Sequence, residues 1–210
     1  MAEKNQISRQ AVILWLLIFA AVFVWSVIRP RDYVIWLLEV MPAVIAFVLL
    51  ALTWKRFPLT ALSYWLILIH AVILMVGGHY TYAEVPFFNW LRDAFDLSRN
   101  SYDKVGHFAQ GFIPAIIARE VLIRTSPVKG GGWLFFLVVS VCLAISAFYE
   151  LIEWWVALLS EEAAEAFLGT QGYVWDAQSD MFFALVGAVL ALVLLKKVHD
   201  RQLARLGEKS

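Results

Sequence analysis

The chain has 210 residues, of which 62% are hydrophobic and 16% are charged, and its mean hydropathy is +0.74. These values exclude an ordinary soluble domain and indicate an integral membrane protein. Because the net charge is zero, nothing favours nucleic acid as a partner. We expect the lipid bilayer as the partner, and the sequence identifies no protein partner.

The apolar runs predict six transmembrane helices. At 1.5 Å per residue, ~20 helical residues cross a ~30 Å hydrocarbon core. The runs lie at residues 11–28, 33–54, 59–76, 105–123, 133–159 and 177–195. The first run is too long for a secretory core and has no small-residue cleavage site after it, so we interpret it as a retained span. The sequence therefore predicts an all-α fold, a polytopic transmembrane helix bundle that forms one integral membrane domain over residues 1–210.

The positive charges predict an orientation for this bundle. Twelve Lys and Arg residues fall on the side that carries both termini, and five fall on the other side. Because cytoplasmic loops are enriched in Lys and Arg, we expect the N-terminus and the C-terminus in the cytoplasm.

Polar side chains gather toward the outer ends of these spans. A charge in hydrocarbon costs roughly 2.5–3.5 kcal/mol on insertion scales, so such residues are rare without a reason. Three pairs have helical spacing, at positions 103 and 107, 150 and 153, and 176 and 180, which gives each helix a polar edge. We predict a pocket at the periplasmic face formed by Glu39, His79, Tyr82, Glu84, Asp103, His107, Gln110, Glu150, Glu153, Asp176, Gln178 and Asp180.

Imidazole and carboxylate groups suit two kinds of chemistry. They are ligands for zinc, manganese or non-haem iron, and they also act as general acids and bases. The candidate catalytic residues are His107, Glu150, Glu153 and Asp180. The candidate binding residues are His79, Tyr82, Glu84, Asp103, Gln110, Asp176, Gln178 and Glu39. The predicted cofactor is a divalent metal ion, with His79, His107, Glu150 and Asp180 as its candidate ligands.

Each of these residues also has a structural explanation. Asp103 and Asp176 stand where helix N-caps are wanted, and His79 is near the end of a span, where water reaches it. Hydrogen bonds between helices explain the other polar side chains.

Polar residues away from the pocket receive structural interpretations alone. The mid-membrane His70 is interpreted as a hydrogen-bonded packing residue, and Glu120 as the partner of Arg124 in a surface pair. His199 is assigned to a basic tail near anionic headgroups. The glycines Gly106, Gly111 and Gly187 are interpreted as close-packing points between helices.

Four motifs carry a resemblance to a known family. They are GGHYTYAEVP at 77–86, DKVGHF at 103–108, ELIEW at 150–154 and WDAQSDM at 175–181. Together they resemble the bacterial YjdF family of inner-membrane proteins over essentially the whole chain. The resemblance implies a multi-pass protein of the bacterial inner (cytoplasmic) membrane and leaves its mechanism open.

A fainter likeness is to the VanZ-like membrane proteins. The matching positions are Asp103, Lys104, His107, Glu150, Asp180 and Gly187. This likeness implies a role connected with envelope lipids. The residues that follow Glu153 and the long segment before Asp176 depart from the VanZ-like pattern.

Three functions are consistent with the sequence. The first is a protein whose periplasmic pocket acts on or binds an envelope lipid or a metal ion. The second is a non-enzymatic scaffold or partner-binding protein, whose polar residues hold its helices together. The third is a proton-coupled transporter, which is disfavoured because the intramembrane charges do not continue through the cytoplasmic halves of the spans.

Overall fold

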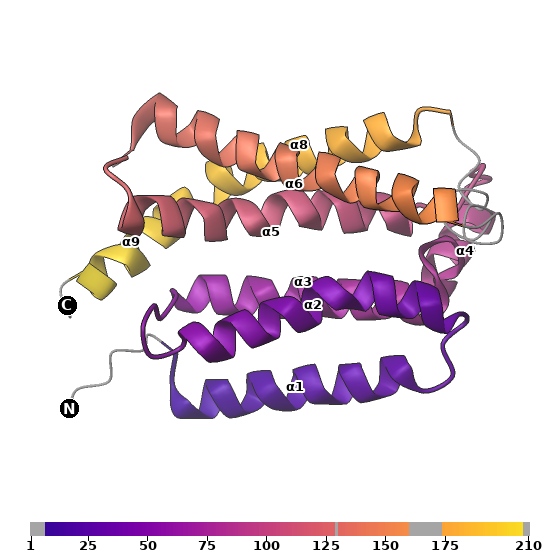
Figure 1. Ribbon diagram of the computed structural model, residues 1–210, viewed down its shortest axis with the longest axis horizontal. Coiled ribbons are helices and arrows are strands. Elements are labelled where there is room, and N and C mark those ends of the chain that lie inside the picture. The colour runs from indigo at the N-terminus through magenta and orange to yellow at the C-terminus, as the bar shows by residue number, and fades with distance from the viewer. Residues whose placement is uncertain (1–6, 129, 160–173, 208–210) are drawn as a thin grey trace.

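The computed structural model describes residues 7–128, 130–159 and 174–207, and within these ranges every regular element is a helix (Figure 1). The elements are α1 (Arg9–Val27), α2 (Tyr33–Thr53), α3 (Ala61–Tyr80), the short 3-10 helix η1 (Tyr82–Glu84), α4 (Pro86–Ala94), α5 (Tyr102–Thr125), α6 (Gly131–Leu159), α8 (Asp176–Leu194) and α9 (Lys196–Gly207). The predicted all-α fold is therefore confirmed.

Five of these helices are long and apolar enough to cross a membrane, namely α1, α2, α3, α6 and α8. The remaining predicted span, 105–123, lies within α5, which has 24 residues and also carries charged side chains. At 1.5 Å per residue α5 is ~36 Å long, and it runs alongside the others in Figure 1. Its crossing of the membrane follows from its length and place in the bundle and stays a prediction.

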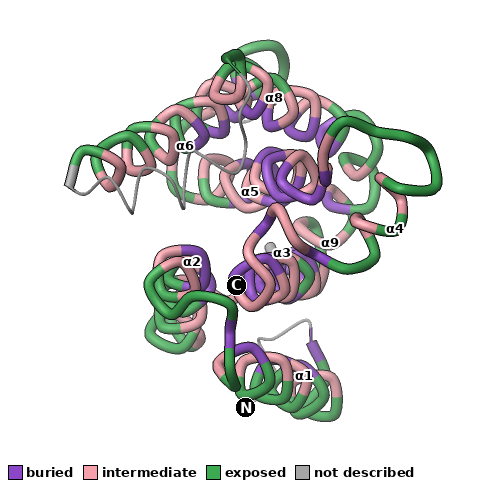
Figure 2. The backbone as a smooth tube through the Cα atoms, turned by 90° about the vertical axis from the view of Figure 1, so that its right-hand side faces the viewer, coloured by how far each residue is buried: buried purple, intermediate pink, exposed green. Residues whose placement is uncertain are grey.

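The helices form two layers that meet at α5. Figure 2 shows α1, α2 and α3 on one side and α5, α6 and α8 on the other. The helix α5 packs against α3, α6 and α8, so its polar side chains are enclosed by neighbouring helices. In Figure 1 the first turn of α1 and the helix α9 lie at the same end of the bundle, as an even number of crossings requires.

Small residues allow the closest approaches between helices. A Cβ atom at Gly111 would collide with the backbone carbonyl of Ala184 on α8, and one at Gly187 would collide with the carbonyl of Phe108 on α5. A Cβ atom at Gly106 would meet the ring of Tyr82. The interpretation of these three glycines as close-packing points is confirmed.

The third helix is longer than its predicted span. The span was placed at 59–76, whereas α3 continues to Tyr80. Gly77 and Gly78 lie inside its last turns, where Gly77 leaves space for the Tyr82 ring and Gly78 for Val40 of α2. Buried packing surface holds these glycines in the helix, although glycine alone favours a helix end.

Two polar groups that were assigned to the membrane surface are buried. The predicted pair of Glu120 with Arg124 is confirmed, but its placement on the surface is wrong, because Glu120 is fully buried. Its carboxylate accepts hydrogen bonds from the backbone N–H and Oγ1 of Thr60 at 2.9 and 2.8 Å, from Ser63 Oγ at 2.7 Å and from Arg124 Nη1 at 2.9 Å. Because Thr60 is the N-cap of α3, these hydrogen bonds join the start of α3 to α5.

His199 joins the same network from α9 and is fully buried, so its assignment to a basic tail near anionic headgroups is also wrong. Arg119 Nη1 lies 2.9 Å from His199 Nδ1, and His199 Nε2 lies 3.2 Å from the Glu120 carboxylate. Because arginine only donates, Nδ1 is the acceptor and Nε2 carries the proton that bonds Glu120. The carboxylate of Asp200 pairs with Arg119 and Lys196. Partial burial raises the pKa of Asp200, but hydrogen bonds from Lys196 and Arg119 outweigh it and lower the pKa below its usual value.

Candidate functional site

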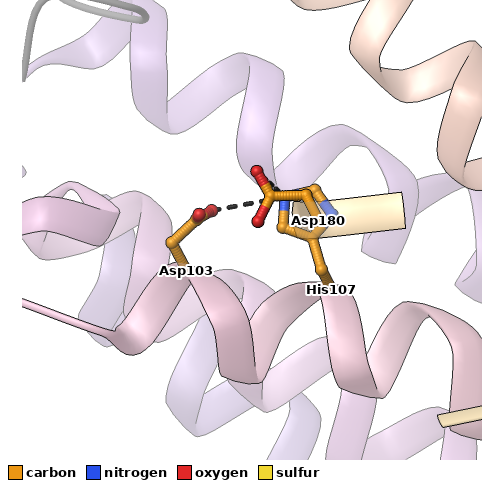
Figure 3. Close-up of side chains that lie close together, drawn as sticks. All are labelled: Asp103, His107 and Asp180. Atoms are coloured by element: carbon orange, nitrogen blue, oxygen red, sulfur yellow. Dashed lines mark ion pairs between the residues drawn. The ribbon is translucent and has the colours of Figure 1, made fainter. Parts of the chain in front are cut away.

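His107 stands at the centre of a group of acidic side chains from three helices. Its Nε2 lies 3.3 Å from Asp103 Oδ1 on the same helix and 3.8 Å from Asp180 Oδ2 on α8. Its Nδ1 lies 3.8 Å from Glu150 Oε1 on α6. Figure 3 shows Asp103, His107 and Asp180 converging. We call Asp103, His107, Glu150, Glu153 and Asp180 the carboxylate cluster.

The local structure explains this convergence. Asp103 and His107 are one helical turn apart on α5, so both side chains leave the same face. Asp180 is one turn into α8, and the glycine contacts between α5 and α8 bring its backbone close enough to reach His107. The N-cap of α5 is Ser101 and that of α8 is Trp175, so neither Asp103 nor Asp176 is the N-cap residue.

The cluster lies just inside one end of the bundle. His107 is five residues after the start of α5, and Asp180 is four residues after the start of α8. Glu39 is six residues after the start of α2. At 1.5 Å per residue these positions are ~6–9 Å below the helix ends. A site at this depth is shielded from bulk water and is still near a membrane surface.

Three carboxylates of the cluster have oxygens without a hydrogen-bond partner. These buried oxygens are Asp103 Oδ2, Glu150 Oε1 and Asp180 Oδ1. The ion pairs that these carboxylates make within the described residues are all with His107. One imidazole carries at most one positive charge, so three ionised carboxylates around it leave an excess of two negative charges. Since buried unpaired charge is strongly unfavourable, protons or a bound cation must neutralise it.

A cavity of about 310 Å³ opens beside His107. Its polar lining consists of Glu39, Tyr82, Asp103, His107, Gln110, Tyr149 and Glu153, with His70 among the lining side chains farther along. Gln110 Oε1 lies 3.0 Å from His107 Nδ1, and the Tyr149 hydroxyl donates a 2.9 Å hydrogen bond to Glu39. The rest of the lining is largely apolar. The volume is at the small end of the range for ligand pockets.

Of the predicted binding residues, Glu39, Tyr82, Asp103 and Gln110 lie at this cavity, and four others lie elsewhere. His79 Nδ1 is 3.1 Å from the carbonyl oxygen of Ser26, and its ring packs against Trp25 of α1. The remaining three do not line the cavity: Glu84 pairs with Arg31, Asp176 pairs with Arg99 at 2.7 Å, and Gln178 is exposed.

Tyr149 is a site residue that the sequence did not single out. It contacts Glu39 directly, and its ring meets that of His107 edge to face at a centroid distance of 6.3 Å. Its spacing of four residues from Glu153 places both on one face of α6, which is the signal that would have found it. The sequence contains many aromatic residues near the ends of its spans, so this spacing alone did not distinguish Tyr149 from them.

Two groups of side chains have the spacing of metal ligands. One is Asp103, His107 and Asp180, and the other is His107, Glu150 and Glu153; in each, one ligand atom per residue lies within 4.8 Å of the others. Two ligands bound 2.1 Å from a tetrahedral ion are ~3.4 Å apart, close to the 3.3 and 3.8 Å measured around His107 Nε2. His79, which was a predicted ligand, belongs to neither group.

Comparison with known proteins agrees with the resemblance noted in the sequence. The chain is 52% identical over 186 residues to the inner membrane protein YjdF of Escherichia coli (strain K12), and the match covers 89% of each protein. No solved structure matches the chain. A family model described as "Predicted membrane protein (DUF2238)" matches residues 11–201, which include all of the carboxylate cluster. The chain therefore belongs to the DUF2238 family of membrane proteins.

Proposed function

We propose that this protein crosses the bacterial inner membrane six times, with both termini in the cytoplasm and the carboxylate cluster near the periplasmic surface. The excess of Lys and Arg on the side of the termini supports this orientation. The name of the E. coli relative supports the choice of membrane. The single domain then comprises α5 together with the five apolar spans.

We further propose that the cluster binds a divalent metal ion, and that this centre acts on the polar end of an envelope lipid. The observation that carries the proposal is the set of three buried carboxylates, each with an unpartnered oxygen, around one imidazole. Because a metal-bound imidazole is neutral, the three ionised carboxylates then carry three negative charges. A divalent cation offsets two of them and supplies a partner for the carboxylates of Asp103 and Asp180. A scaffold that only joins helices has no need of unpartnered acceptors.

The residues divide into two roles around such an ion. His107, Asp103 and Asp180 supply one nitrogen and two carboxylate oxygens, a set that suits zinc, manganese or iron. Glu153 lines the cavity, where its carboxylate would act as the proton acceptor, and a bound divalent ion would supply Lewis-acid chemistry. Gln110, whose Oε1 lies 3.0 Å from His107 Nδ1, would hold the imidazole in orientation, and Glu150 lies 3.8 Å from the same nitrogen.

Elemental analysis of the purified full-length protein tests the metal centre. We expect about one divalent ion per chain, and we expect Asp103→Asn and Asp180→Asn to lower the affinity for that ion by at least roughly 10–100-fold, the range for loss of residues that support metal ligands, so that less ion is retained on purification. The matched control is Asp176→Asn, one turn earlier on α8, because Asp176 pairs with Arg99 outside both ligand groups. A protein that folds normally and holds no stoichiometric ion would contradict the proposal.

A further inference from the structure

A second hollow lies on the membrane-facing side of the bundle, between α2 and α6. It has a volume of about 320 Å³. Its wall on α2 includes Met41, Ile45 and Leu49, and its wall on α6 includes Tyr149 and Ile152. The α2 side chains are exposed by 41% to 55% although they belong to an apolar membrane span. We call this hollow the lateral groove.

The lateral groove adjoins the cavity beside His107. Four residues, Pro42, Ala46, Tyr149 and Glu153, line both. Glu153 and Tyr149 therefore stand where the apolar groove meets the polar end of the cavity. The two layers of the bundle diverge here, since α2 lies in the layer opposite α6 in Figure 2. The arrangement is amphipathic: hydrocarbon at the outer opening, and carboxylates at the inner end.

The place of the groove in the bilayer decides which molecules meet it. A single hydrocarbon chain is thin enough to lie along the apolar side chains of α2 that form its wall. Because the groove opens within the apolar length of a membrane span, the molecules that meet it there are the chains of bilayer lipids.

We propose that one acyl chain of a glycerophospholipid enters sideways between α2 and α6, and that its headgroup reaches Glu39, Tyr149 and Glu153 beside His107. This inference rests on the proposed lipid-acting metal centre and names its substrate class. Headgroup hydroxyls donate hydrogen bonds to the carboxylates of Glu39 and Glu153. When the metal ion is bound, a headgroup phosphate supplies oxygen ligands to that ion, whereas entry of the acyl chain depends on the apolar walls of the groove alone.

Photocrosslinking in vesicles tests the route. The full-length protein is reconstituted with phosphatidylglycerol that carries a diazirine in one acyl chain, and the labelled peptides are mapped by mass spectrometry. We expect label concentrated at residues 41–49 of α2 and 149–153 of α6. We expect excess unlabelled phosphatidylglycerol to displace this label more than the label at Leu17 and Val24 of α1, which are exposed and line neither hollow.

Substitutions that fill the groove supply the decisive comparison. Ala46→Trp and Leu49→Trp should each lower labelling of the groove by several-fold. The second variant keeps the bundle interior unchanged, because Leu49 is 55% exposed. The matched control is Val48→Trp, which is on the same helix, is 47% exposed and lines neither hollow. Label spread evenly over all lipid-facing helices, or groove label unchanged in both variants, would overturn the inference.

Metal content separates the two proposals. The groove variants should retain the metal ion, whereas Asp180→Asn should lose it and still admit the acyl chain. Groove-specific labelling in a protein without a stoichiometric ion would overturn the metal centre alone. A stoichiometric ion in a protein without groove-specific labelling would overturn the lipid route alone.

Discussion

His107 and Glu120 are both buried polar residues of α5, but their surroundings differ in one respect. Glu120 accepts hydrogen bonds from backbone, hydroxyl, guanidinium and imidazole donors. The carboxylates around His107 retain unpartnered oxygens. A fully satisfied network stabilises a fold, whereas an incompletely satisfied one is a candidate site for a ligand. This contrast indicates a structural role for Glu120 and supports the proposed metal site at the carboxylate cluster.

The structural role predicts a large loss of stability in Glu120→Ala. The substitution leaves Thr60, Ser63, Arg124 and His199 without their shared acceptor, and removing one partner of a buried pair costs about 3–5 kcal/mol. Thermal unfolding in detergent measures this. For comparison, Asp93→Ala removes an exposed pair with Arg92 and should change stability by at most about 1 kcal/mol. Equal stability of the two variants would contradict the structural role.

The residue scale is also where sequence reasoning was least complete. Helical spacing correctly joined Asp103 to His107, because i and i+4 residues share a face whatever their surroundings. It could not place His79, whose neighbours Trp25 and Ser26 are on α1, or His199, whose acceptor Glu120 is 79 residues away. Such contacts depend on which helices are neighbours, and local spacing carries no information about that.

At the scale of elements, the apolar runs predicted each long helix to within a few residues at most ends. The largest difference is the C-terminal end of α3, where tertiary packing retains Gly77 and Gly78 in the helix. The helices α4 and α9 were not predicted, because hydropathy detects only membrane spans. With 9 and 12 residues, α4 and α9 are too short to cross a membrane, and α9 is also polar. Hydropathy thus predicts which segments cross, and packing between helices determines where their polar faces meet.

The contact of α5 with α8 is the element-scale feature on which the cluster depends. In Gly111→Ala, the new Cβ collides with the backbone carbonyl of Ala184, so the helices must separate. We expect a loss of about 1–3 kcal/mol in stability, as for other overpacked contacts, and lower metal occupancy because Asp180 moves away from His107. Unfolding and elemental analysis of the same preparation measure both.

A neutral glycine substitution is available as the control for this variant. Gly132 lies in the first turn of α6, and a Cβ there would have no neighbour within 4 Å. Gly132→Ala should therefore leave metal content unchanged and stability equal or slightly higher, since alanine favours helix. Normal metal occupancy in Gly111→Ala would show that the cluster does not need the close contact.

At the scale of the whole molecule, the proposal depends on the number of crossings. Six crossings place both termini on one side and the carboxylate cluster, α4 and the start of α8 on the other. Five crossings, with α5 inside the bundle but not spanning, would separate the termini. The two topologies differ only in α5, whose length equals that of a span while its composition is more polar.

Cysteine labelling of intact cells distinguishes these topologies. The buried Cys142 is first replaced by alanine, and single cysteines are introduced at the exposed positions Gln10, Asp93 and Arg205. An impermeant maleimide should label Asp93→Cys from outside, and it should label Gln10→Cys and Arg205→Cys only after the inner membrane is made permeable. Because α5 connects the α4 side to the α6 start, labelling of Arg205→Cys from outside, with Gln10→Cys still protected, would remove α5 from the set of spans. The carboxylate cluster would then no longer lie at the periplasmic ends of the helices, and a lipid of the outer leaflet would have no route to it.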